Sequence, residues 1–403
     1  MRLPTLYWPH SLTVTLLLLS PFDLLASLAM DMYLPVVPHM QTALGASEST
    51  LQLTLTLYLV LLGAGQLLFG PLSDHLGRRP VLLSGGVVFS LSSAGIALTT
   101  STDWLLILRV VQACGASACL VATFATVRDI YAGRPESHVV YGLMGSMLAL
   151  VPAIGPLAGA IIDTLFGWRA IFGLLSGWML LAVLLAGRYW PETRQPRNNA
   201  VTWQHGLRPL RHLHFWLYTC GYSAGMGCFF VFFSTAPWVL IERHGLSQLH
   251  FSVWFASVAV VMAITAKCMG KVIPRWGKLK TLCIAMGCII AGALMLALGE
   301  RLQPNEVAGF IVPMWVVAVG IAAAVSVAPN GALAGFDAIA GTATAVYFCL
   351  GSLLLGLVGT FATALLPVNT AWPVVGSGLF FAAVVLTLAS IQRLISRHHQ
   401  DGE

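Results

Sequence analysis

The chain has 403 residues, of which 58% are hydrophobic and only 9% are charged, and its formal net charge is +6 at pH 7. Soluble domains carry about 25% charged residues, so this composition excludes an ordinary soluble protein and indicates one embedded in a membrane. The basic residues form no run dense enough for a nucleic-acid-binding groove.

Twelve apolar segments follow one another along the chain. Each has the roughly 20 apolar residues needed to cross a hydrocarbon core about 30 Å thick. Helices satisfy every backbone polar group inside lipid, so we predict an all-α integral membrane protein with 12 transmembrane helices. The predicted spans are residues 12–36, 51–69, 80–98, 104–127, 139–162, 170–190, 214–238, 249–269, 280–299, 307–328, 339–366 and 371–392.

Two aspartates, Asp23 and Asp31, lie inside the first segment. A carboxylate at mid-membrane depth costs about 2.5–3.5 kcal/mol on insertion scales, so such acids are usually kept for function. Eight residues apart on a helix, they are about 12 Å apart along the axis and about 80° apart around it. Both can therefore face one cavity, and we predict that they couple proton movement to substrate binding. The alternative is that either acid only hydrogen-bonds a neighbouring helix.

The turn between the second and third segments reads GPLSDHLGRRP, from Gly70 to Pro80, and holds three charged candidates for gating. Asp74 can accept hydrogen bonds from a neighbouring helix N-terminus and from arginine, and so hold the helices in one orientation. Arg78 and Arg79 are either part of that gate or surface charges that only fix the topology.

Arg109 begins the second turn of the fourth segment, at a depth similar to that of Asp31. We expect the two to form an ion pair or to share a hydrogen-bond network. Because a neighbouring arginine favours the charged form of an acid, Asp23 would then be the more readily protonated aspartate. The alternative is an arginine whose side chain reaches the outer surface.

In the fifth segment, Gly155 and Pro156 follow Pro152. Proline removes a backbone hydrogen bond and glycine lets helices approach closely, so these residues form either a hinge that limits proton leak or ordinary packing. Further along, Tyr222 and Tyr347 combine an aromatic face with a polar tip, which suits an apolar pocket with a few polar anchors; the alternative is that each faces lipid or the core.

The longest polar stretch divides the chain into residues 1–190, a six-helix bundle, a central cytoplasmic loop at 191–213, and residues 214–403, a second six-helix bundle with a short tail. A faint repeat supports this division, since GKVIPRWGKLK stands 200 residues after GPLSDHLGRRP. Two bundles with a site at their interface are the architecture that this pattern favours.

Lysine and arginine are distributed unequally between the loops. With the N-terminus inside, seventeen lie on the cytoplasmic side and three on the outer side, while Arg109 lies within a span. This asymmetry predicts that both termini are cytoplasmic. The seventeen are Arg2, Arg78, Arg79, Arg128, Arg134, Arg188, Arg194, Arg197, Arg208, Arg211, Lys267, Lys271, Arg275, Lys278, Lys280, Arg393 and Arg397, and the three are Arg169, Arg243 and Arg301.

Three of these stretches resemble motifs of the major facilitator superfamily. GPLSDHLGRRP is similar to GxLaDrxGrkp, with His75 where a basic residue is usual, and RVVQACGASA with Arg109 is similar to RxxqGxgaa. PAIGPLAGA resembles the antiporter motif gxxxGPxxGG, with Ala160 in place of the last glycine. Longer stretches such as PFDLLASLAMDMYLP and LVATFATVRDIYAGRPE look like the chloramphenicol and florfenicol exporters of bacteria.

The resemblance implies a proton-driven exporter of phenicol antibiotics in the bacterial inner membrane, and not an enzyme. Its partners would be the drug, protons and membrane lipid, with no cofactor, no metal and a monomeric state. The expected substrate-binding residues are Asp23, Asp31, Arg109, Tyr222 and Tyr347. A broad multidrug:proton antiporter that also accepts cations stays open, as do a membrane-embedded enzyme and a receptor. No HExxH, GxSxG or metal-ligand cluster supports the enzyme.

Overall fold

The computed structural model describes residues 10–131, 136–194, 208–302, 305–336 and 340–400. Over these residues the chain is helical without a strand, and eleven helices are long and apolar enough to cross a membrane. The fifth predicted span lies on a further helix, of which Leu150–Phe166 forms a shorter apolar part. The all-α fold class is therefore confirmed. Of the predicted central loop, residues 195–207 lie outside the described residues, as do Arg2, Arg134 and Arg197.

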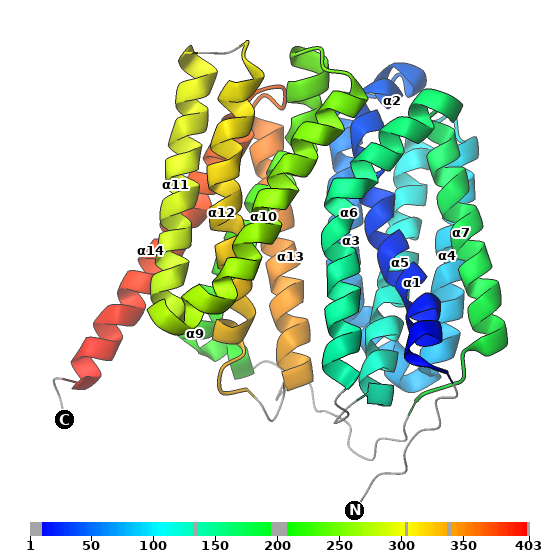
Figure 1. Ribbon diagram of the computed structural model, residues 1–403, viewed down its shortest axis with the longest axis horizontal. Helices are drawn as coiled ribbons and strands as arrows, with labels where there is room; N and C mark the ends of the chain where they lie inside the picture. The colour runs from blue at the N-terminus through cyan, green and yellow to red at the C-terminus, as the bar shows by residue number, and fades with distance from the viewer. Residues whose placement is uncertain (1–9, 132–135, 195–207, 303–304, 337–339, 401–403) are drawn as a thin grey trace, which may run out of the picture. The chain divides into compact units, whose positions relative to one another are not determined.

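The chain divides into two compact units, Met1–Ala200 and Val201–Glu403. In unit 1, α1 packs against α5, α6 and α7, while α4 packs against α5 and α7 and α3 against α5. The helices of this unit are α1 (Leu12–Asp31), α2 (Val37–Leu44), α3 (Glu48–Leu76), α4 (Arg78–Leu98), α5 (Thr102–Tyr131), α6 (Glu136–Phe166) and α7 (Trp168–Tyr189) (Figure 1).

Unit 2 repeats this packing scheme helix by helix. Here α9 packs against α12, α13 and α14, while α11 packs against α12 and α14 and α10 against α12. Its helices are α9 (Leu213–Pro237), α10 (Gln248–Trp276), α11 (Lys278–Leu302), α12 (Val307–Ala332), α13 (Ala340–Leu365) and α14 (Trp372–Gln400). Each unit thus has a first helix, α1 or α9, that touches three others of its own unit.

The repeat extends to the residues that start and end the helices. Ser47 and Ser247 cap α3 and α10 by accepting the backbone N–H groups of Thr50 and His250 at 3.1 and 3.3 Å. Gly77 and Gly277 end the same two helices with φ of +111° and +79°, a conformation that residues with a Cβ rarely adopt. The faint sequence repeat therefore marks equivalent turns.

The first predicted span, 12–36, is not one continuous helix. α1 ends at Asp31, a short 3₁₀ turn follows at Leu34–Val36, and α2 begins directly after it. Pro35 accounts for the break, because a proline disfavours helical geometry in the residue before it and donates no backbone hydrogen bond. The last carbonyl groups of α1 are consequently left to find partners outside the helix.

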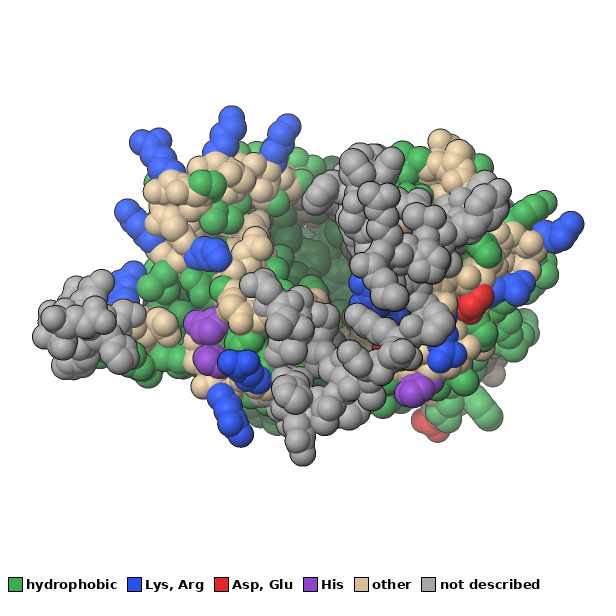
Figure 2. All heavy atoms as spheres, turned by 90° about the horizontal axis from the view of Figure 1, so that it is seen from below, with side chains coloured by type: hydrophobic (Ala, Val, Ile, Leu, Met, Phe, Trp, Pro, Cys, Tyr) green, Lys and Arg blue, Asp and Glu red, His purple; other side chains and the backbone are tan. Residues whose placement is uncertain are grey.

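Basic side chains gather at one end of each unit, which Figure 2 views face on. In unit 2 they include an exposed set on the last turns of α10 and the first turn of α11, namely Lys267, Lys271, Arg275, Lys278 and Lys280. In unit 1 the corresponding turn between α3 and α4 holds Arg78 and Arg79.

Candidate functional site

Both aspartates of α1 are buried, Asp23 with 2% and Asp31 with 7% of its surface exposed. Among the described residues, neither forms an ion pair. Phe22, next to Asp23, packs edge-on against Trp190 with ring centroids 5.9 Å apart. Asp31 is the last residue of the helix. The two acids therefore lie in a protected interior, at two levels of one helix.

Two glycines of α6 bring that helix against Asp31 and Met32. A Cβ atom at Gly155 would lie 2.5 Å from the Cβ of Asp31, and one at Gly159 would lie 2.8 Å from the carbonyl carbon of Met32. The four-residue spacing puts both glycines on one face of α6, where small residues allow the closest approach of two helices. Pro156 is also buried in α6. The motif predicted as a hinge is therefore the surface that receives the acidic end of α1.

Arg109 is fully buried and caps the end of α1. Its Nη1 donates to the carbonyl oxygen of Ala29 at 3.1 Å, one of the last carbonyls of the helix. A cation at this end also offsets the negative pole of the helix dipole. The guanidinium lies 4.6 Å from the ring centre of Tyr33 and 4.4 Å from that of Tyr58, so cation–π contacts with both rings stabilise it.

The expected ion pair between Arg109 and Asp31 is not formed. Arg109 Nη1 instead also donates to Gln112 Oε1 at 2.8 Å, and Gln112 Nε2 donates to Ser93 Oγ at 2.7 Å, which ties α1 to α5 and α4. Tyr58 donates its hydroxyl to the carbonyl oxygen of Ala26 at 2.6 Å. The arginine therefore holds the backbone of α1 and not the carboxylate, and the reason for taking Asp23 as the more readily protonated acid falls away.

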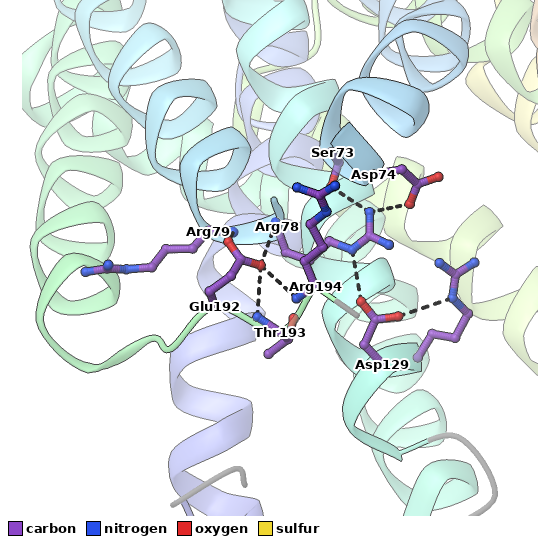
Figure 3. A network of polar contacts seen from close by, with 9 residues as sticks. Ser73, Asp74, Arg78, Arg79, Asp129, Glu192, Thr193 and Arg194 are labelled. Atoms are coloured by element: carbon purple, nitrogen blue, oxygen red, sulfur yellow. Dashed lines mark hydrogen bonds and ion pairs between the residues drawn. The ribbon is translucent and has the colours of Figure 1, made fainter. Parts of the chain in front are cut away.

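The gating candidates form a second polar cluster, at the turn from α3 to α4 (Figure 3). Arg78, with 5% of its surface exposed, pairs with Asp74 at 2.5 Å and with Asp129 at 2.9 Å, and donates to Ser73 Oγ at 3.1 Å. Arg79 donates through Nη2 to the carbonyl oxygen of Gly187 at 2.5 Å. Burial and ion pairing show that Arg78 is more than a surface charge. Asp74 lies in the last turn of α3 and Arg78 opens α4, so a single residue, Gly77, forms the predicted turn between the two helices.

Tyr222 of α9 and Tyr347 of α13 stand together in unit 2. Their ring centroids are 5.3 Å apart, and Phe348 packs against both. Tyr347 is fully buried, yet its hydroxyl has no hydrogen-bond partner among the described residues. Gly351 makes room for this cluster, since a Cβ there would lie 2.7 Å from the ring of Tyr222. A buried hydroxyl without a hydrogen-bond partner destabilises the folded protein, so we expect a bound molecule to supply that partner.

The structure thus brings Asp31, Arg109 and Gly155 together around the end of α1, and Asp74, Arg78 and Arg79 around a separate turn. It adds residues to both sites that reasoning from the sequence had not assigned, namely Tyr33, Gln112, Gly159, Asp129 and Glu192. Of these, Gly159 carried a readable signal, because it stands four residues after Gly155 in the small-xxx-small pattern of packed membrane helices.

Two helical units that share one packing scheme, the first of them with buried acids on its first helix, are typical of a multi-pass membrane transporter. The chain belongs to the Major Facilitator Superfamily, whose model matches residues 22–360. It is 61% identical over 387 residues to a chloramphenicol resistance protein of Pseudomonas aeruginosa, covering 96% of this chain and 92% of that one. It is also 27% identical to multidrug resistance protein D of Escherichia coli K12, over 87% of this chain and 89% of that one.

Two solved structures share the fold of this chain. A bacterial homologue of the human lysosomal transporter Spinster, inward-facing and unoccupied, has a TM-score of 0.74 at 15% identity and covers 96% of this chain and 97% of that one. A D-xylose-proton symporter has a TM-score of 0.72 at 17% identity, over 93% and 97% of the two chains. At such identities the likeness concerns the fold alone.

Proposed function

We propose that this protein exports chloramphenicol-type antibiotics from the bacterial cell in exchange for protons. The observation that carries the proposal is the 61% identity, over 96% of the chain, to a protein named for chloramphenicol resistance. The substrate class is a small, neutral aromatic drug with hydroxyl groups. Acceptance of florfenicol belongs to the same proposal.

Asp23 and Asp31 carry the protons in this proposal. Each is almost fully buried without an ion-pair partner in the described part of the chain, so its charged form is exposed to the full cost of desolvation. Binding of a proton removes that cost and release restores it. Such an acid suits an exchange cycle in which the binding of a proton and the binding of the drug exclude one another. The proton is then bound on one side of the membrane and the drug on the other.

Tyr222 and Tyr347 bind the drug. A ring can stack on the aromatic surface that they form with Phe348, and the unpaired hydroxyl of Tyr347 can bond a polar group of the drug. Arg109 acts through α1, whose end it holds beside Asp31. The protein has six-helix bundles at 1–190 and 214–403, joined by a cytoplasmic segment at 191–213, and works as a monomer surrounded by lipid.

The cluster of Asp74, Arg78 and Arg79 gates the cycle, and the approach of Gly155 and Pro156 to α1 limits proton leak. The exposed lysines and arginines at the turn between α10 and α11 support an orientation with this face and both termini in the cytoplasm. The protein would then lie in the inner membrane and move drug outward.

Transport in energised vesicles tests the proposal. The drug is uncharged, so exchange for protons moves net charge, and the membrane potential contributes about 2.3 kcal/mol per charge per 100 mV. We expect labelled chloramphenicol to be moved uphill, more slowly when the potential is collapsed at a fixed pH gradient. Uphill movement that ignores the potential would contradict net charge transfer, and absence of uphill movement would contradict export.

A multidrug:proton antiporter that also accepts cations is the second candidate. The similarity to multidrug resistance protein D supports it, because two buried carboxylates could also receive a cationic drug. Growth in chloramphenicol, florfenicol and ethidium separates the candidates. Resistance to phenicols alone supports the first, and protection against ethidium supports the second.

A further inference from the structure

The short segment that follows α7 carries a glutamate that caps the helix of the gate. Glu192 accepts four backbone N–H groups, those of Arg78 at 2.9 Å, Arg79 at 3.2 Å, Thr193 at 2.9 Å and Arg194 at 2.8 Å (Figure 3). The first N–H groups of a helix lack partners within it, and α4 has no side-chain cap from its own N-cap residue, Gly77. A carboxylate at this positive end of the helix is favoured by the dipole as well.

The turn and the segment fit one another from both sides. A Cβ atom at Gly77 would lie 3.0 Å from the carboxyl carbon of Glu192 and still closer to its Oε2, so a larger residue there would displace the carboxylate from its present place. In the other direction, Arg79 Nη2 donates to the carbonyl oxygen of Gly187 near the end of α7. The contact therefore depends on residues of the turn between α3 and α4 and on residues at and after the end of α7.

Arg78 connects this cap to the gate. Its backbone N–H is held by Glu192, while its side chain reaches Asp74, Asp129 and Ser73. On the same segment, the ring of Trp190 packs edge-on against Phe22, the residue before Asp23. One short stretch of chain thus touches both the turn of the gate and the helix that carries the proton-coupling acids.

Unit 2 holds the equivalent turn differently. Lys278, which stands 200 residues after Arg78 in the repeat, donates to the carbonyl oxygen of Asn330 at 2.7 Å.

We propose that Glu192 is a positioning residue of the transport cycle: it sets the place of Arg78 in the gate and links that gate to the neighbourhood of Asp23. The inference rests on the proposed function, because it assigns Glu192 to the movement of the drug and not to its binding. Glu192 touches no substrate in this mechanism. Its removal should slow the conformational cycle and leave drug affinity unchanged.

The test compares Glu192→Gln and Glu192→Ala in the full chain with a matched control, Glu242→Gln, at an exposed glutamate of unit 2. Chloramphenicol binding is measured on purified protein and drug exchange on proteoliposomes. Hydrogen exchange of the Arg78 and Arg79 amides is measured without drug. For both Glu192 variants we expect faster amide exchange and a transport rate about tenfold lower, with Kd changed less than about twofold. Glu242→Gln should match the wild type.

A double variant separates gating from general damage. Because Glu192 and Asp74 both act through Arg78, Glu192→Gln combined with Asp74→Asn should be no slower than the slower single variant. Multiplied losses, parallel loss of binding and rate, or an unchanged rate would each overturn the proposal, as would unchanged amide exchange. A wild type that neither binds nor moves chloramphenicol would contradict the proposed function, while amide exchange would still decide whether Glu192 holds the turn.

Discussion

The close contact between α1 and α6 makes Gly159→Ala the most direct test of how the acidic helix is held. A Cβ at this position would lie 2.8 and 2.9 Å from the carbonyl carbon and Cα of Met32, whereas real Cβ contacts essentially never fall below 3.0 Å. These are backbone atoms, so no side-chain rotation relieves the overlap. The two helices must move apart by about 1 Å to restore ordinary contact at 3.4–4 Å.

The cost of that movement can be estimated. Overpacking of a close-packed interior destabilises by about 1–3 kcal/mol, and a shift of about 1 Å at a working group can lower a rate about 100-fold. Gly177→Ala on α7 is the matched control, since nothing lies within 4 Å of a Cβ there. Alanine should stabilise that helix by about 0.5–1 kcal/mol.

Thermal unfolding of the purified variants and drug uptake in vesicles give the two measurements. Gly159→Ala should unfold at a lower temperature than the wild type and transport poorly, while Gly177→Ala should match or exceed the wild type in both. Equal behaviour of the two variants would refute the inferred packing of α6 on Met32.

Three further predictions follow from the contacts described above. Arg109→Lys keeps the charge, but a lysine cannot both hydrogen-bond Ala29 and Gln112 and fill the space beside the two tyrosine rings. Thermal unfolding should therefore show a loss of stability of about 1–3 kcal/mol. Tyr347→Phe removes a buried hydroxyl without a partner in the described part of the drug-free protein, so it should stabilise that protein by about 1–3 kcal/mol; it should nevertheless raise the KM for chloramphenicol about three- to tenfold, because the drug-bound state uses the hydroxyl. Burial, with the charge of Arg243 beside it, lowers the pKa of His244 from its ordinary 6.5, so the unfolded chain binds the proton first and stability falls as the pH drops through 6.5. His244→Gln should lessen that loss, as unfolding measured over a pH series will tell.

Most of the fold was predictable because lipid allows few solutions. An apolar run of the right length in a chain with so little charge has to become a membrane helix, and each predicted segment coincides over most of its described residues with a helix. The break after Asp31 was not predicted, although Pro35 was in view, because a proline near the end of a span can either kink the helix or end it. Which of the two occurs depends on partners such as Arg109 and Tyr58, supplied by distant parts of the chain.

The parts of the candidate site that could be predicted are single residues whose burial in the membrane is costly by itself. A buried aspartate stands out in an apolar segment, so Asp23 and Asp31 could be selected without a structure. The partner of Arg109 could not, because similar depth in the membrane does not determine which group a long side chain reaches. Here a carbonyl of α1 and two aromatic rings outcompete the carboxylate.

Glu192 illustrates a different limit. Its sequence neighbourhood, PET after the end of α7, indicates a polar segment leaving the membrane and contains no sign of a helix cap. The capped helix begins 114 residues earlier, at Arg78. A cap supplied from so far away leaves no local pattern, unlike the serines that precede α3 and α10.

The central claim is that carboxyl groups of α1 exchange protons for drug, and uphill transport of labelled chloramphenicol in energised inside-out vesicles tests it most directly. We expect Asp23→Asn and the double variant with Asp31→Asn to lose uphill movement while still equilibrating the drug down its gradient. Continued uphill pumping by the double variant, abolished by a protonophore, would contradict the account.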